Sequence, residues 1–308
     1  MRWNLVGDYL VYLLVRIMIA VLQALPLETC HRCTRPLVWL VADVFKVRHR
    51  VLHENLSLSF PEMPESERTE LVRRTWEHLL LMVVEIAHAP RKIHQTNWRD
   101  HIHLRNDRCL VSNMLSKRPA MIVLGHFGNF EVAGQVVGLL GLPTFTVARP
   151  LDNPFLHDMV EESRTRNGQV ILPKQGSGPE VEAMLAEGGT LTVLCDQSAG
   201  RKGCWVDFFG RPASTNKAMA VFALSYDAPM MVSYSRRLNN KPLQIEIGLC
   251  GDMDPREETG ELKTIPGLTA WFTKCLEGAI RRDPEQYWWV HRRWKGNEDR
   301  VAKQRKAA

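Results

Sequence analysis

Apolar positions along the chain change their spacing from segment to segment, and this separates predicted helices from predicted strands. Between Ser66 and Pro90 they recur at helical spacing, which predicts an amphipathic helix that Ser66 caps and that ends near Pro90. From residue 120 onward, short apolar runs typical of buried strands alternate with longer helical patterns. The predicted strands cover residues 121–124, 144–148, 170–172, 191–194, 230–235 and 243–249. One predicted helix follows the strand at 121–124 and ends at residue 141. Three further predicted helices cover residues 153–166, 179–186 and 267–281.

Strands that alternate with helices of this length form βαβ units, so the predicted fold class is α/β, with a mainly parallel sheet flanked by helices. Parallel sheets bind their ligands beyond the carboxyl ends of the strands. Three predicted strands end just before a chemically active side chain, namely His126, Arg149 and Asp196. We therefore expect these three side chains to lie along one edge of the sheet.

The turn after the first of these strands has the sequence GHFGNFE at residues 125–131. Gly128 permits a tight turn and the close approach of another group, and Glu131 falls in the first turn of the next helix. From there its carboxylate can accept a hydrogen bond from one nitrogen of His126, which leaves the other nitrogen to take a proton. No serine lies in a GxSxG turn, so this base would act on a hydroxyl of the substrate. The same spacing also has a purely structural interpretation.

The N-terminal segment has the pattern of a membrane anchor. Residues 9–25 are apolar apart from Arg16 and Gln23, which share one helix face, and Pro26 ends the stretch. This pattern favours a helix that lies in the membrane interface or dips into it. A cleaved signal peptide and a buried amphipathic helix are the alternatives. Basic residues that favour anionic lipid follow the stretch, at Arg32, Arg35, Lys46, Arg48 and Arg50.

The 308 residues include 40 Lys+Arg and 34 Asp+Glu, a formal net charge of +6 that favours an anionic partner. Much of the excess lies near the C-terminus, where we expect a basic tail over residues 297–308. No nucleic-acid-binding motif accompanies it, so anionic lipid is favoured over nucleic acid. No series of long uncharged apolar runs is present, which excludes a polytopic transporter. The 7 cysteines are mostly scattered singly, which favours a reducing compartment, and no motif requires a metal or cofactor.

The GHFGNFE segment resembles the HxxxxD/E motif of the lipid A biosynthesis lauroyl/myristoyl acyltransferases. Further segments resemble this family in the same order, namely NL at 55–56, FPE at 60–62, RPLDNP at 149–154, DQ at 196–197, VDFFGRPAST at 206–215 and QYWWVHRRWK at 286–295. The resemblance implies a glycerolipid-acyltransferase-like domain at residues 51–296, after an anchoring region at 1–50. It also implies transfer of a fatty acyl group from acyl carrier protein to a hydroxyl of a lipid A precursor, at the cytoplasmic face of the inner membrane and without a cofactor.

By position in these motifs, the resemblance implies that His126 is the general base and Glu131 its acidic partner. Arg149 would meet a phosphate of the donor or acceptor, for which a guanidinium is well suited, and a surface salt bridge is the alternative. Asp196 and Gln197 would orient the substrate or only support the cleft. The expected substrate contacts are therefore Arg149, Asp196, Gln197, Gly128 and Asn129.

Three other functions stay open at this point. An acyltransferase of the same kind could use acyl-CoA and act on another glycolipid, such as a phosphoinositide mannoside. A hydrolase could use the same histidine on water, and a non-catalytic lipid-binding membrane protein could keep the fold. The FFG segment at residues 208–210 has two interpretations as well, because it either packs in the core or lines an acyl tunnel.

Overall fold

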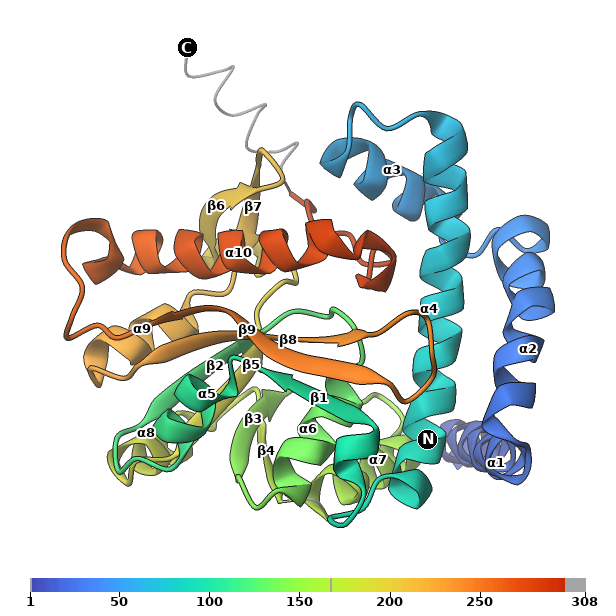
Figure 1. Cartoon of the computed structure of the whole chain (residues 1–308), viewed down its shortest axis with the longest axis horizontal. Helices are drawn as coiled ribbons and strands as arrows, with labels where there is room; N and C mark the ends of the chain where they lie inside the picture. Colours follow the sequence, from blue (N-terminus) through green and yellow to red (C-terminus); the bar gives the residue numbers. More distant parts are fainter. Residues whose placement is uncertain (1, 167, 297–308) are drawn as a thin grey trace.

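The computed structural model describes residues 2–166 and 168–296 and is built around a seven-stranded sheet (Figure 1). The strand order is β1-β9-β8-β2-β5-β3-β4, in which β8 and β9 run antiparallel and the other neighbours run parallel. The strands are β1 (Ile102–Arg105), β2 (Ala120–Leu124), β3 (Thr144–Ala148), β4 (Gln169–Pro173), β5 (Thr190–Leu194), β8 (Met230–Arg237) and β9 (Ile245–Met253). The predicted α/β class with a mainly parallel sheet is confirmed.

Helices cover both faces of the sheet (Figure 1). Successive side chains of a strand point to opposite faces, so in β2 Met121 and Val123 pack into one core cluster and Ile122 into another. The first face packs against α8 (Gly178–Ala186), α9 (Ala218–Ser225) and α10 (Ile265–Arg282). The second packs against α4 (Glu65–Lys92), α5 (Asp107–Met114) and α6 (Phe130–Leu139), while α7 (Pro154–Thr165) lies beside β4.

Helix α4 departs from the predicted bounds at both ends. Its N-cap is Pro64 rather than Ser66, and Pro90 lies inside the helix instead of ending it. The backbone N–H of Ile93 still donates to the carbonyl of Ala89 at 2.9 Å, so helical bonding continues past the proline. A proline removes its own N–H bond, and so close to the end of a long helix that single loss does not stop the helix.

A two-stranded hairpin of β6 (Cys204–Phe208) and β7 (Arg211–Thr215) projects beyond α10 and was not predicted (Figure 1). Phe209 and Gly210 form its turn, with φ of 55° and 72°. Two positive φ angles are what a tight two-residue hairpin requires. Phe208 and Phe209 are buried in a cluster with Trp289, so the FFG segment packs in the core.

The N-terminal part forms α1 (Arg2–Ala24), α2 (Leu27–Val38), a π-helix (Trp39–Val44) and α3 (His49–Ser59). In Figure 1, α1 is seen end-on and α2 along its length, so the chain changes direction between the two helices. The segment Leu5–Ala24 is long and apolar enough to cross a membrane, and none of it is buried in the protein. This exposure excludes the buried-helix alternative. The expected basic tail at 297–308 lies outside the described residues.

Candidate active site

Two neighbouring parallel strands bring His126 and Asp196 together. Leu124 at the end of β2 is the register partner of Leu194 at the end of β5. The ladder continues for one more bond, because the N–H of Cys195 donates to the carbonyl of Leu124 at 2.8 Å. His126 and Asp196 each follow two residues after this paired position. Their side chains therefore meet just beyond the carboxyl edge of the sheet, where an α/β fold places its ligands.

Asp196 holds His126 at two points. Its Oδ2 accepts the backbone N–H of His126 at 2.8 Å, and its Oδ1 lies 2.7 Å from Nδ1 of the ring. The two side chains are 3% and 13% exposed, respectively. A carboxylate can only accept here, so Nδ1 carries a hydrogen, and in the neutral ring Nε2 presents its lone pair. The side-chain amide nitrogen of Gln197 lies 3.2 Å from this Nε2.

The charges of this pair change both pKa values. Burial opposes a charge on the His126 ring, but the Asp196 carboxylate outweighs it and raises the pKa of the imidazole above its ordinary value. Burial likewise opposes a charge on Asp196, and the charge and hydrogen bonds of His126 nevertheless lower the pKa of that carboxyl. The arrangement therefore favours a proton on Nε2 next to an ionised Asp196, which is what a base needs when it takes a proton in a reaction.

Glu131 is not the hydrogen-bond partner of His126, which corrects the prediction made from their spacing. It lies in the first turn of α6, and its carboxylate binds the guanidinium of Arg164 from α7, with Nε of Arg164 at 3.1 Å from Oε2 and Nη2 on Oε1. This bidentate geometry satisfies both carboxylate oxygens. Glu131 still acts on His126 through its charge, which contributes to the raised pKa of the imidazole.

Arg149 follows β3 at the same edge of the sheet but belongs to a separate cavity of about 320 Å³ beside α7. Arg164 and His157 line this cavity too, together with the apolar side chains Leu151, Val160 and Ile171. The guanidinium of Arg149 is exposed and pairs with Asp152 at 2.6 Å. The His126–Asp196 pair and Arg149 thus do not bond to one another in this structure.

The N-terminal helix α1 packs next to this cavity. The rings of Tyr9 and Tyr12 contact Phe155 in the first turn of α7, with centroids 5.3 Å and 5.9 Å away. The side-chain amide of Asn153 also donates to the carbonyl of Asp8 at 2.8 Å. Because α7 also forms one wall of the cavity, the apolar helix α1 and the cavity share a supporting element.

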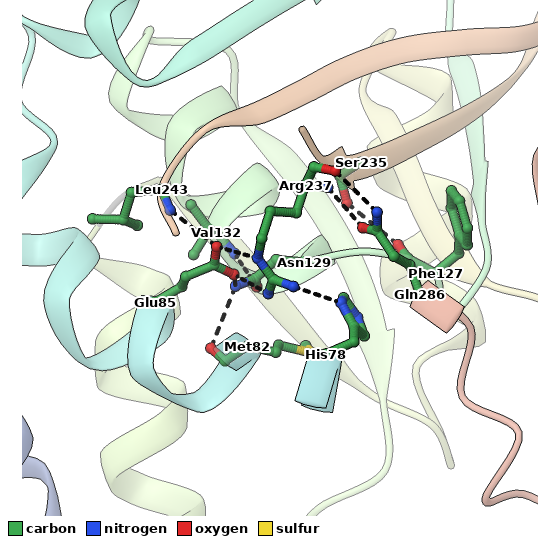
Figure 2. A network of polar contacts seen from close by, with 10 residues as sticks. All are labelled: His78, Met82, Glu85, Phe127, Asn129, Val132, Ser235, Arg237, Leu243 and Gln286. Carbon is green, nitrogen blue, oxygen red and sulfur yellow. Dashed lines mark hydrogen bonds and ion pairs between the residues drawn. The ribbon is translucent and has the colours of Figure 1, made fainter. Parts of the chain in front are cut away.

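Gly128 and Asn129 hold the loop at residues 125–131 in place, and Asn129 belongs to a buried polar network (Figure 2). Gly128 has a φ of 63°, and a Cβ there would lie 1.2 Å from the carbonyl oxygen of Ser235. Asn129 is fully buried and caps α6, because its Oδ1 accepts the N–H of Val132 at 3.2 Å. Its Nδ2 donates to Glu85 at 2.9 Å. A side chain with no exposed surface cannot contact a ligand in this conformation.

A buried ion pair holds Asn129 in turn (Figure 2). Glu85 of α4 and Arg237 of β8 form two hydrogen bonds of 2.7 Å, and both side chains are essentially unexposed. Arg237 also donates to Nδ1 of His78 at 3.0 Å, and Glu85 accepts the N–H of Leu243 at 3.0 Å. Burial and the Arg237 charge place the pKa of His78 well below its ordinary value, so His78 is neutral. The sequence signal for this network is an acidic residue on a predicted apolar helix face, which we did not single out.

The segment after α10 forms backbone hydrogen bonds with the loop at residues 125–131. The N–H of Gly128 donates to the carbonyl of Gln286 at 2.8 Å, and the N–H of Trp288 donates to the carbonyl of His126 at 3.0 Å. The Gln286 side chain bonds both ways to the backbone of Arg237, at 2.7 Å and 2.9 Å (Figure 2). The ring of Trp288 lies 5.0 Å from that of His126. The backbone around His126 is therefore held by Asp196 after β5, by Ser235 of β8 and by the segment after α10.

Comparison of the sequence with known proteins shows which protein family the chain is related to. The sequence model of the bacterial lipid A biosynthesis acyltransferases matches residues 4–296. The chain is 28% identical over 284 residues to the lipid A biosynthesis lauroyltransferase of Escherichia coli, covering 90% of this chain and 89% of that one. It is 28% identical over 257 residues to the lipid A biosynthesis palmitoleoyltransferase of Escherichia coli, covering 81% and 79%. It is 24% identical over 269 residues to a lipid A biosynthesis acyltransferase of Haemophilus influenzae, covering 85% and 82%.

Among solved structures, the 1-acyl-sn-glycerophosphate acyltransferase of Thermotoga maritima aligns with 77% of this chain and 96% of its own. The TM-score is 0.37 and the identity 12%, which is too distant to add to the assignment. The sequence relationships to the lipid A biosynthesis acyltransferases support the assignment, and the protein is an acyltransferase. Because the matched region spans residues 4–296, the chain belongs to the bacterial lipid A biosynthesis acyltransferase family.

Proposed function

We propose that the protein transfers a fatty acyl group from acyl carrier protein to a hydroxyl of a lipid A precursor, with His126 as the general base. The observation that carries this proposal is the orientation of the His126 ring. Its Nδ1 is bonded to the buried Asp196, while Nε2 points away from Asp196 and lies 3.2 Å from the side-chain amide nitrogen of Gln197. Membership of the family supports the reaction type and the class of acceptor.

In this mechanism, Nε2 of His126 takes the proton of the acceptor hydroxyl while the oxygen attacks the thioester carbonyl carbon. A C–O bond forms, the C–S bond breaks, and the departing thiolate receives the proton back from Nε2. Asp196 stabilises the transient imidazolium, because its carboxylate is already bonded to Nδ1. The amide of Gln197, 3.2 Å from Nε2, would give up this position to the incoming hydroxyl. No serine or cysteine nucleophile takes part in this scheme.

The cavity beside α7 suits the phosphorylated head group of the acceptor. Arg149 and Arg164 present guanidinium groups there, paired with Asp152 and Glu131, respectively. His157 adds an imidazole, which lies 3.3 Å from Glu161 in the same lining. Guanidinium groups bind phosphate oxygens bidentately, and the apolar part of the lining can accept a sugar-linked acyl chain. Arg149 is exposed and its partner Asp152 is a neighbour in sequence, so a phosphate can compete for it.

We infer that residues 1–50 attach the protein to the cytoplasmic face of the inner membrane. Two observations support this: the unburied apolar segment Leu5–Ala24, and a cluster of exposed large apolar side chains around the π-helix. In that cluster Trp39 is 58% exposed and Phe45 is 69% exposed. Lys46 and Arg48 follow directly, a combination of aromatic and basic residues that favours an anionic membrane interface.

The proposal is tested with the purified full-length protein in detergent, a lipid A precursor with a free hydroxyl, and acyl donors of several chain lengths on acyl carrier protein or on CoA. We expect mass spectrometry to show the precursor gaining one acyl group from the carrier-protein donor, and no product with His126→Ala. Free fatty acid formed without an acceptor would identify a hydrolase instead. Acylation only of a phosphoinositide mannoside, or only from acyl-CoA, would reject the proposed acceptor or donor. No turnover of any donor would favour a lipid-binding protein.

A further inference from the structure

Arg293 is a buried guanidinium whose hydrogen-bond partners are neutral. It is 2% exposed, and it donates from Nη1 to the carbonyl of Ser214 at 2.7 Å and from Nη2 to Oγ1 of Thr215 at 2.6 Å. Its guanidinium carbon lies 5.0 Å from the centre of the Phe208 ring, and Nε has no acceptor. Within residues 2–166 and 168–296, no carboxylate lies within ion-pair distance of Arg293.

A buried cation without a bonded counter-ion is costly, so its place in the fold needs an explanation. Burial lowers the pKa of Arg293, and the Asp196 carboxylate counteracts this through its charge. Asp196 is buried as well, and its carboxylate accepts hydrogen bonds from His126 and from the neutral hydroxyl of Tyr287. The carbonyl of Ser214 accepts both Nη1 of Arg293 at 2.7 Å and the N–H of Ala199 at 3.2 Å, so Arg293 lies against the loop that follows β5 and carries Asp196. Arg293 and Asp196 are therefore two opposite charges buried on neighbouring segments, and each changes the pKa of the other.

The charge on Asp196 favours a protonated His126 ring, whereas a base must be neutral before it can accept a proton. While His126 is protonated, the Asp196 carboxylate is neutralised by the ring it is bonded to. A base must, however, begin the reaction neutral, and Asp196 is then a buried anion with no charge on its bonded partner. Without a further cation nearby, the buried Asp196 anion would favour a proton on His126 or on Asp196 itself before the reaction starts.

We propose that Arg293 is a positioning residue that keeps Asp196 ionised while His126 is neutral, and so keeps His126 free to accept a proton. This role rests on the proposed function of His126 as the base. The positive charge of Arg293 stabilises the Asp196 anion and at the same time opposes premature protonation of the imidazole. Its neutral partners on β7 leave this charge uncompensated at the guanidinium itself.

The other titratable groups around His126 do not supply this charge. Glu131 from α6 is an anion that favours protonation of His126, and it is itself paired with Arg164. Burial lowers the pKa of His291, whose Nε2 accepts the N–H of Ser198 at 3.4 Å, so His291 is neutral. Burial and the nearby Asp196 keep the pKa of Tyr287 well above its ordinary value, so its hydroxyl is neutral as well.

The test follows the protonation of His126 directly. The full-length protein is labelled with ¹³C-histidine in detergent micelles, the His126 ring signal is identified by its loss in His126→Gln, and its midpoint is measured by titration. Arg293→Gln keeps a hydrogen-bonding side chain but removes the charge, Arg293→Met is a second uncharged variant, and Arg293→Lys restores the charge. Arg118→Met is the matched control, because Arg118 binds Asp254 at 2.7 Å at the opposite edge of the sheet.

We expect the uncharged variants to raise the midpoint of His126 by about one pH unit, equivalent to a tenfold loss of neutral imidazole below the midpoint. The acid limb of kcat/KM should move upward by the same amount, Arg293→Lys should return it, and Arg118→Met should leave it in place. A folded Arg293→Gln or Arg293→Met protein with the midpoint of the wild type would overturn the proposal. A role in folding alone predicts lower stability of both variants with an unmoved midpoint.

The two proposals fail in distinguishable ways. If His126→Gln retains full acyl transfer, the general-base assignment is wrong, whatever Arg293 does. If His126→Gln is inactive but charge removal at Arg293 leaves the His126 midpoint unmoved, only the role of Arg293 is wrong. The ring signal is read without substrate, so the second result does not depend on finding the correct acceptor.

Discussion

The carboxylate of Asp196 binds His126 through both the backbone and the ring, at 2.8 Å to the N–H and 2.7 Å to Nδ1. One side chain thus sets where His126, the proposed base, lies, how its ring is turned and which ring nitrogen is free. The two residues are 70 positions apart in sequence and meet because β2 and β5 are neighbours in register. The geometry of the His126–Asp196 pair therefore depends on the sheet as much as on the histidine motif.

Asp196→Asn should remove the negative charge at this position while keeping a hydrogen-bonding side chain of the same size. The amide oxygen can keep one hydrogen bond to His126, but the negative charge that raises the pKa of the imidazole is lost. The base therefore deprotonates at lower pH, and the acid limb of the rate profile should move downward, while turnover falls by about 10²- to 10⁴-fold because the imidazolium is no longer stabilised. The measurement is kcat against pH for both proteins. Unchanged turnover with an unmoved limb would contradict the assignment.

Glu131 and Arg164 should behave as one unit. Glu131→Gln, Arg164→Gln and the double variant form a cycle, and we expect a coupling of about 0.5–3 kcal/mol in the activation free energy, because the two side chains are only 26% and 25% exposed. The matched control is Glu162 of α7 with Arg166, the C-cap of that helix, an exposed pair for which we expect a coupling below about 0.5 kcal/mol. Additive effects of Glu131→Gln and Arg164→Gln would instead mean that Glu131 acts independently of Arg164.

Gly128→Ala should be far more damaging than Gly141→Ala. Both glycines have positive φ, 63° and 77°, so both alanines pay about 1–2 kcal/mol of backbone strain. At Gly141 a Cβ meets nothing within 4 Å, whereas at Gly128 it would overlap the carbonyl oxygen of Ser235. We expect Gly128→Ala to lower the free energy of unfolding well beyond the control and to abolish activity. Equal denaturation midpoints for the two variants would show that β8 can move away from the loop.

Removing one partner of the buried Glu85–Arg237 pair should destabilise the protein by about 3–5 kcal/mol, because an uncompensated charge stays buried. Glu85→Gln also weakens the support of Asn129, so turnover should fall in the fraction that remains folded. Replacing both partners by apolar residues should cost less than the sum of the single variants. Chemical denaturation with a spectroscopic probe measures each effect, and a loss below 1 kcal/mol for Glu85→Gln would argue against this account.

The exposed aromatic residues of the π-helix region should bind lipid. Trp39→Ser together with Phe45→Ser should lower binding to vesicles with anionic lipid by about tenfold, since burying such side chains contributes roughly 1.5–3 kcal/mol each when complete. Leu115→Ser is the control, because Leu115 is 69% exposed but follows α5 on the body of the protein. Flotation of the variants with vesicles measures the effect. Equal losses for both changes would mean that apolar exposure in general, rather than this region, governs binding.

Much of the sheet could be predicted because buried parallel strands appear as short apolar runs. All six predicted strands overlap observed ones. Strand β1 was missed because the sequence IHLR at 102–105 has no apolar run, and its stability comes from pairing with β9. The β6–β7 hairpin was missed because its turn is Phe209-Gly210, which lacks the Asn-Gly or Asp-Gly signal of tight hairpins.

The location of the site could be predicted, but its pairing could not. His126 and Asp196 were expected at one edge of the sheet because each follows a strand. Which carboxylate bonds the imidazole depends on β5 lying next to β2, and strand order is not readable from local spacing. The HxxxxE spacing therefore favoured Glu131. Likewise, Glu85 and Arg237 lie 152 positions apart, and only the folded chain brings them together.

The bonds from Gln286 and Trp288 to the loop around His126 have a consequence for biosynthesis. Gln286 and Trp288 are synthesised later than α1 and later than every strand of the sheet. While these strands and α1 are being made, the loop around His126 therefore still lacks the backbone bonds that fix it. The loop reaches its final form only when the segment that follows α10 has been synthesised.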